Sequence, residues 1–150
     1  MKARHQARVL ALQALYEIDC VHHAPAIVLA HLLESQPVPK HVAAFCRRLV
    51  YGALEYQSVL DVFIHKYAPE WPLEQMAYID RNILRMALFE FVVDGRTPMR
   101  VAINEAVELA KTFGSDSAPR FVNGVLGSLV EHQDAIRQAV DRLDMENEKA

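Results

Sequence analysis

The amino-acid sequence predicts an all-α fold of about seven helices. Apolar residues recur at helical spacing along nearly the whole chain, and no segment alternates apolar and polar residues between turn residues as a half-buried strand would. The clearest stripe consists of Val42, Cys46, Leu49, Ala53, Tyr56, Leu60, Phe63 and Tyr67, and the next of Ile103, Ala106, Val107, Ala110 and Phe113. Each stripe lines one helix face and should be buried.

Breaks rich in proline and glycine divide the chain into helical segments near residues 4–20, 25–35, 40–67, 73–93, 99–113 and 118–138. The long third segment forms one helix or two consecutive helices, and its division gives the seventh. We expect Thr97 to cap the segment 99–113, with Pro98 in its first turn and Gly114 at its end. Residues 1–140 should form a single domain, followed by a frayed polar tail at 141–150.

Composition indicates a folded domain in a reducing compartment. Hydrophobic residues make up 52% of the 150 residues, and the formal net charge is -3. These values exclude typical disorder and argue against a protein that coats nucleic acid through bulk charge. No apolar run approaches the ~18 residues of a membrane span, and the N-terminus lacks the pattern of a signal peptide. Cys20 and Cys46 fall within apolar helical patterns, so we expect reduced, packed thiols in the cytoplasm.

The sequence lacks the usual catalytic motifs, which favours a binding protein over an enzyme and predicts no cofactor or metal. It contains no G-x-S-x-G element, phosphate-binding loop or dinucleotide fingerprint. Cys20 with His22 and His23 comes closest to a metal cluster, but a fourth ligand is missing. Glu105 and Glu108 share one helix surface, so they cannot face each other across a cleft as glycosidase carboxylates do.

The first helix opens with positive charge, which its own dipole disfavours by about 0.3 to 1 kcal/mol for each cation. Arg4 and Arg8 are four residues apart and share a face, so both guanidinium groups could meet the same phosphates. A solvated terminus with chance charge is the alternative that spacing leaves open. The RNA-binding interpretation requires that neither arginine is buried in a carboxylate pair, and changing both to glutamate should then leave the melting temperature unchanged.

A second candidate site surrounds the loop at residues 114–119. Lys111 and Arg120 flank this loop, and Phe121 could stack on a nucleic-acid base. Phe121 is also at helical spacing with the apolar residues that follow it, which is typical of a core position. Lys111 lies in the last turn of its helix, where a cation is favourable in any case.

Four stretches of the chain carry a specific resemblance. They are ARVLALQALYEID (7–19), IDRNILRMALFEF (79–91), VAINEAVELAKTFG (101–114) and RFVNGVLGSL (120–129). In order and spacing they resemble the bacterial NusB family of transcription antitermination factors. The resemblance implies two packed helical bundles that bind the boxA element of ribosomal RNA leader transcripts as a heterodimer with NusE. It also implies action with other Nus factors on RNA polymerase.

The resemblance assigns roles to individual residues. It implies RNA-binding by Arg4, Arg8, Lys111, Arg120 and Phe121, and NusE-binding by Tyr16 and Asp80. The family's first helix often opens with consecutive arginines, whereas His5 and Gln6 stand between Arg4 and Arg8 here. Fewer cations release fewer counterions, so we expect weak RNA binding without NusE. Spacing leaves open whether Tyr16 faces solvent or core.

Other functions remain open from the sequence. NusB-like helical domains also precede rRNA cytosine methyltransferases, so an accessory or protein-interaction domain is the alternative. The chain has no Gly-rich strand–loop–helix that would bind a methyl donor. Homodimerisation, which hides the RNA face in some family members, is possible too.

Overall fold

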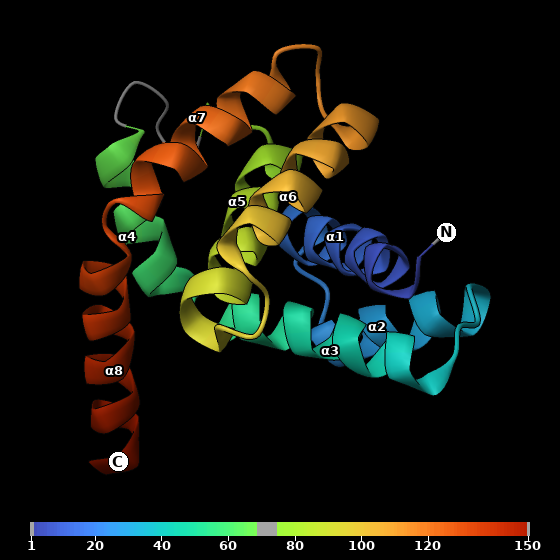
Figure 1. Ribbon diagram of the computed structural model, residues 1–150. Coiled ribbons are helices and arrows are strands. Elements are labelled where there is room, and N and C mark those ends of the chain that lie inside the picture. The colour runs from blue at the N-terminus through green and yellow to red at the C-terminus, as the bar shows by residue number, and fades with distance from the viewer. Residues whose placement is uncertain (1, 69–74, 150) are drawn as a thin grey trace.

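The computed structural model describes residues 2–68 and 75–149, and every regular element in these ranges is helical (Figure 1). The elements are α1 (Ala3–Val21), α2 (Pro25–Ser35), α3 (Lys40–Glu55), α4 (Gln57–Tyr67), α5 (Tyr78–Leu88), the π-helical turn η2 (Phe89–Asp94), α6 (Met99–Phe113), α7 (Ala118–Val130) and α8 (Gln133–Lys149). The all-α prediction is confirmed.

The helices form two packed bundles that share α5. In the first bundle α1 packs against α2 and α3, and α2 also contacts α3. In the second, α6 packs against α5 and α7, and α4 packs against α7 and α8. Helix α5 lies in the middle and contacts α1 and α3 on one side and α4, α6 and α7 on the other (Figure 1). The arrangement matches the two bundles that the resemblance implies.

The long third segment divides at Tyr56 into α3 and α4. Five residues of its predicted stripe are buried, and Tyr56, Phe63 and Tyr67 are half-buried. Leu49 and Leu60, on opposite sides of the break, are both fully enclosed in one continuous core. Gly52 lies on the buried face of α3, where the ring of Phe89 lies so close that a side chain has no room. The sequence pattern therefore located this core face correctly.

The predicted cap of α6 is wrong, although the helix has the expected ends. The N-cap of α6 is Pro98, and no side chain caps the helix there. The hydroxyl of Thr97 instead donates to Oε1 of Glu90 at 3.0 Å. Water can satisfy the N–H groups at an exposed helix end, whereas a buried carboxylate such as that of Glu90 depends on hydrogen-bond donors from the protein. Gly114 ends the helix as predicted.

The C-terminal region differs most from the prediction. A turn at residues 131–132 divides the segment 118–138 into α7 and α8, so the described ranges contain eight α-helices instead of about seven. Residues 141–149 of the predicted tail are helical, because α8 continues to Lys149. Val140 is buried, and the hydroxyl of Tyr56 donates to Oδ1 of Asp144 at 2.8 Å. These contacts attach α8 to the α3–α4 break.

Two further predictions concern the break before α5 and the cysteines. The start expected at residue 73 lies outside the described residues, and α5 begins at Tyr78. Cys46 is packed in the core, and burial raises the pKa of its thiol to about 11. Cys20 is exposed near the end of α1, so the expectation of a packed thiol is wrong there. No helix in the described ranges is long and apolar enough to cross a membrane.

We predict that Gly52→Ala destabilises the protein. An added Cβ would lie 2.2 Å from the Cε1 and Cζ atoms of Phe89, whose ring is held within the core. Overpacking costs about 1 to 3 kcal/mol, which exceeds the gain of about 1 kcal/mol that alanine brings to a helix interior. The free energy of unfolding in urea measures the effect.

The matched control is Gly127→Ala on α7, where an added Cβ meets no atom within 4 Å. We expect this variant to be more stable than the wild-type protein by up to about 1 kcal/mol. A gain of stability in both variants would contradict the close packing at Gly52.

Candidate nucleic-acid interface

Arg8 lies inside the protein, and its predicted role in phosphate binding is wrong. Its side chain is only 3% exposed, and Nε and Nη2 donate to Glu90 at distances of 3.0 and 2.8 Å. Glu90 lies in the η2 turn and also accepts the hydroxyl hydrogen bond of Thr97. The donors of Arg8 are thus turned to a buried carboxylate and away from solvent. Its role in the folded chain is to join α1 to η2.

Arg4, one turn earlier, remains a candidate for RNA binding. It is exposed, and its Cζ lies 4.6 Å from the centroid of the Phe45 ring on α3. No ion pair joins Arg4 to a carboxylate within the described ranges. His5, by contrast, is bound through Nδ1 to Oε2 of Glu105 at 2.7 Å. The opening of α1 therefore presents one available guanidinium group in place of two.

A pocket of about 390 Å³ lies between the start of α5 and the start of α7. Its lining residues are Gln75, Met76, Ala77, Asp80, Ser115, Ser117, Arg120 and Phe121. The structure thus places two of the five residues expected to bind RNA, Arg120 and Phe121, beside Asp80, which is expected to bind NusE. Phe121 is half-buried, so its ring both packs on the core and lines the pocket. Both sequence interpretations of Phe121 are compatible with this position.

The Asp80 carboxylate has an unsatisfied oxygen. Its Oδ1 atom is enclosed and accepts no hydrogen bond, and burial raises the pKa of Asp80 above its ordinary value. An added Cβ at Gly114 would approach this oxygen to 3.4 Å, so the glycine leaves space beside the carboxylate. Buried polar atoms in folded proteins nearly always have partners.

Lys111 and Tyr16 lie outside this pocket. Lys111 is exposed on α6, where Nζ lies 3.2 Å from Oε1 of Glu108. Tyr16 is 41% exposed and stands edge-on to the equally exposed Tyr78, with ring centroids 6.3 Å apart. The Cζ atom of Arg81 lies 4.4 Å from the centroid of the Tyr78 ring. The open question about Tyr16 is therefore settled, because it faces solvent.

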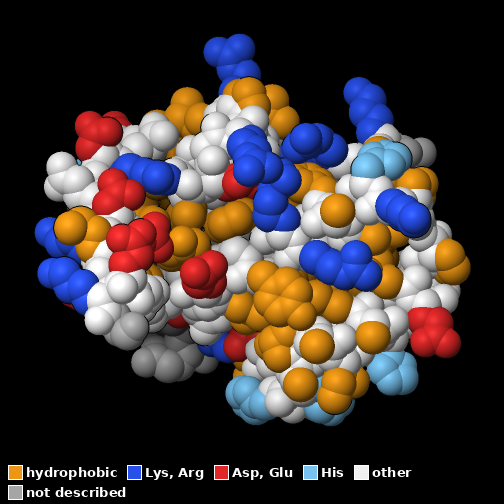
Figure 2. Space-filling model, turned by 90° about the horizontal axis from the view of Figure 1, so that it is seen from below, with side chains coloured by type: hydrophobic (Ala, Val, Ile, Leu, Met, Phe, Trp, Pro, Cys, Tyr) orange, Lys and Arg blue, Asp and Glu red, His pale blue; other side chains and the backbone are white. Residues whose placement is uncertain are grey.

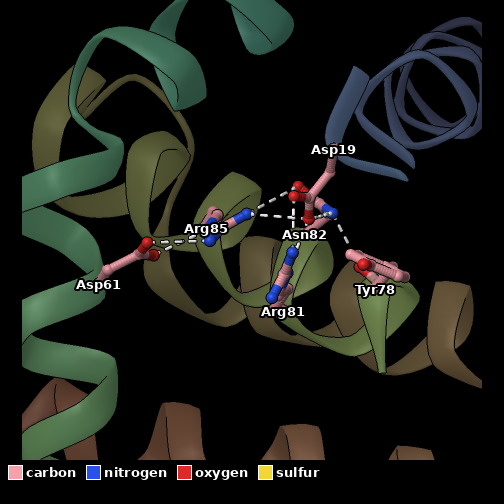
Figure 3. A network of polar contacts seen from close by, with 6 residues as sticks. All are labelled: Asp19, Asp61, Tyr78, Arg81, Asn82 and Arg85. Carbon is pink, nitrogen blue, oxygen red and sulfur yellow. Dashed lines mark hydrogen bonds and ion pairs between the residues drawn. The ribbon is translucent and has the colours of Figure 1, made fainter. Parts of the chain in front are cut away.

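A polar network fixes α1 against the helices beneath this aromatic surface (Figure 3). Arg81 donates from Nε and Nη2 to the two oxygens of Asp19, both at 2.6 Å. Asn82 donates to Asp19 at 2.8 Å, and Arg85 contacts Asp19 at 3.2 Å. Arg85 also donates to both oxygens of Asp61 on α4, at 2.7 and 2.8 Å. Three helices, α1, α5 and α4, are joined through this network.

Two residues beside Arg4, Phe45 and Arg48 on α3, were not predicted from the sequence. Arg48 on α3 reaches the same Phe45 ring, with its Cζ 4.9 Å from the centroid. Residues three apart on a helix are surface neighbours, so the spacing of Phe45 and Arg48 was an available signal.

Within the described ranges no three His, Cys, Asp or Glu side chains form a group that could hold a metal ion.

Comparisons with known proteins agree on one family. The model of the NusB family matches residues 5–131. The transcription antitermination protein NusB of Chloroflexus aggregans is 49% identical over 138 residues, covering 91% of this chain and 92% of that protein. Its counterpart in Roseiflexus sp. (strain RS-1) is 50% identical over 129 residues, covering 85% and 91%. A crystal structure of NusB and NusE in complex with double-stranded RNA superposes with a TM-score of 0.78 at 26% identity, covering 93% of this chain and 98% of that chain.

We predict that Asp19→Asn destabilises the protein at neutral pH by about 3 kcal/mol, because Arg81 and Arg85 lose a buried counter-charge. Burial raises the pKa of Asp19, but the hydrogen bonds from Arg81 and Asn82 and the arginine charges outweigh it, so the pKa lies below the ordinary 3.8. The stabilisation is therefore complete above the unfolded-state pKa and is lost as pH falls through the folded-state pKa.

Urea unfolding of both proteins at pH 7 and at about pH 3 tests this dependence. The control is Glu17→Gln, since Glu17 on the same helix is exposed and forms a solvent-exposed ion pair with His23 at 3.5 Å. A stability gap between the wild-type protein and Asp19→Asn that is as large at about pH 3 as at pH 7 would show that the charge is not its source.

Proposed function

The chain belongs to the NusB family, and from that premise we propose that it is a transcription antitermination factor. In this proposal it binds boxA-type RNA of ribosomal RNA leader transcripts jointly with NusE, in the cytoplasm, and acts without catalysing a reaction. Other Nus factors and RNA polymerase join the complex. The observation that carries the proposal is the pocket in which Arg120 and Phe121 lie beside the unsatisfied carboxylate of Asp80.

The RNA-binding part of the proposal uses both basic regions. Arg4 meets a backbone phosphate, since its side chain is exposed and has no acidic partner in the described ranges. Phe121 offers its ring face to a base in the pocket, and Arg120 at the rim meets the adjoining phosphate. Lys111 adds a weaker contact, because Glu108 partly neutralises it. Single-stranded RNA suits this arrangement, because its bases are free to enter the pocket.

The partner-binding part uses the exposed aromatic surface beside the pocket. Tyr16 and Tyr78 form an edge-to-face pair, and aromatic side chains of this kind are frequent anchors in protein interfaces. Asp80 follows Tyr78 by two residues on α5 and borders the pocket beside this aromatic surface. A partner bound to these residues would stand at the rim of the RNA pocket, which supports joint recognition of the RNA.

Isolated binding of RNA should be weak. The chain carries a net charge of -3, and the burial of Arg8 leaves a single free arginine at the start of α1. If ~3 to 5 phosphates are contacted, the affinity for single-stranded RNA should fall with salt at a logarithmic slope of about -2 to -3.5. NusE then supplies the remaining contacts.

The functional test is a titration of boxA, scrambled and double-stranded RNA with and without NusE. We predict that Arg4→Glu lowers the affinity of the complex for boxA RNA about tenfold or more at ~0.1 M salt, because one phosphate contact becomes a repulsion. Phe121→Leu should lower it by about tenfold, since leucine keeps the apolar packing but offers no flat face to a base. Fluorescence anisotropy measures both effects.

The control is Arg142→Glu, an exposed position on α8 at the opposite side of the molecule from the N-terminus (Figure 1). Arg4→Glu and Arg142→Glu should both keep the wild-type melting temperature, whereas Arg8→Glu should lose stability because it places a second carboxylate beside Glu90. Equal RNA affinity of the wild-type and Arg4→Glu complexes would refute the phosphate contact, and no preference for boxA over scrambled RNA would refute the function.

We predict further that Tyr16→Ala weakens NusE binding by about 2 kcal/mol, the size expected of an aromatic anchor. Tyr51→Ala on α3 removes an equally exposed tyrosine, at 45% exposure, and should leave NusE binding unchanged. Isothermal titration calorimetry separates the two variants. Equal losses would place the NusE contact elsewhere.

A further inference from the structure

Three guanidinium groups surround one aromatic ring where α1 meets α3. The Cζ atoms of Arg4, Arg48 and Arg8 lie 4.6, 4.9 and 5.4 Å from the centroid of the Phe45 ring. The ring's negative faces attract each cation by about 0.5 to 2 kcal/mol, whereas the cations repel one another. A cluster of this kind is more stable when an anion is added.

The three arginines differ in their acidic partners, since Arg8 and Arg48 each form an ion pair. Arg8 is paired with its buried carboxylate. Arg48 lies 3.6 Å from Oδ2 of Asp94, beyond hydrogen-bonding distance, and Asp94 is shared with Arg96. The Nε and Nη2 atoms of Arg48 are enclosed and have no hydrogen-bond partner. Arg4 has no carboxylate partner in the described ranges, and the Arg48 side chain as a whole is 32% exposed, so the cluster keeps a positive charge that solvent can reach.

A pocket of about 220 Å³ opens beside the ring. Its lining residues are Ala3, Arg4, His41, Val42, Ala44, Phe45 and Arg48, and none of them is acidic. Stacking on Phe45 occupies the faces of the guanidinium groups and leaves the N–H donors at their edges available. Two arginine forks that border one pocket suit an anion with several oxygens, of which phosphate is the commonest.

We propose that Arg4 and Arg48 together bind one phosphate group of the RNA backbone in this pocket, with Phe45 holding the two guanidinium groups in position. The inference rests on the proposed function and extends its RNA-binding surface from α1 onto α3. Figure 2 views the side on which α2 and α3 lie, and a group of Lys and Arg side chains is visible near its upper centre. Most Asp and Glu side chains of this face lie toward the left, the side of α8, so the path of the RNA backbone over α3 avoids them.

The test compares Arg48→Gln with Arg47→Gln in the complex with NusE and boxA RNA. Arg47 is the next residue on α3, is exposed, and borders a different pocket with Lys40 and Val38. Both changes remove one charge, so bulk electrostatics affects them equally. We expect Arg48→Gln alone to lose a phosphate contact. Its RNA affinity should fall about fivefold at ~0.1 M salt, and the logarithmic slope of affinity against salt should become smaller in magnitude by about 0.7. Melting temperatures establish that both variants are folded.

Equal RNA affinities of the two variants, with boxA binding by the wild-type complex intact, would overturn the phosphate site and leave the proposed function standing. Titration of the isolated protein with inorganic phosphate tests the site without RNA, through the arginine Nε–H signals in NMR spectra. Shifts of the Arg4 and Arg48 signals at millimolar phosphate support the site, even if boxA binding fails. The absence of any shift would overturn the phosphate site. It would also be overturned if an acidic peptide displaced the RNA at a lower concentration than scrambled RNA does.

Discussion

The rest of the structure depends on the attachment of α1 to α5 and to the η2 turn that follows it, by charged groups at two separate points. Near its start α1 is bound through Arg8 to Glu90, and near its end through Asp19 to Arg81 and Arg85. The chain direction is opposite in the two helices, so they pack antiparallel. The eleven residues from Arg8 to Asp19 span about 16 Å, so the two points lie roughly three turns apart. Two such points fix both the rotation and the axial position of α1.

These ion pairs specify the arrangement more than they stabilise it. Burying two charges costs nearly as much as their attraction returns, so the apolar core supplies the net stability. Separating a buried pair is different, since each unpaired charge then costs about 3 to 5 kcal/mol. A slip of α1 by one turn would separate Arg8 from Glu90 and Asp19 from Arg81 together. The alternative packings that an alanine- and leucine-rich helix would otherwise tolerate are thereby excluded.

Sequence patterns within single helices predicted the positions of the helices well. They missed features that depend on contacts between residues far apart in the sequence. Apolar spacing and breaks placed α2, α3 and α6 correctly, because those signals lie within one turn or at one end of each helix. Arg8 was assigned to the surface because its partner is 82 residues away in sequence. Its spacing from the buried Leu12 and Leu15 was the local sign that it belongs to the apolar face. The pocket at Asp80 and Phe121 likewise combines helices that periodicity treats separately.

Several residues of the candidate sites lie on the two helices α1 and α5, close to the ion pairs. Arg4 precedes Arg8 by one turn, Tyr16 precedes Asp19 by three residues, and Asp80 is adjacent to Arg81. The contacts that orient Arg8, Asp19 and Arg81 toward the interior therefore determine which neighbouring side chains reach the surface. A partner bound at Tyr16 and an RNA bound at Arg4 and Phe121 would then meet preformed positions on one rigid frame. Such joint binding gains affinity from preorganisation and needs no change of shape in the protein.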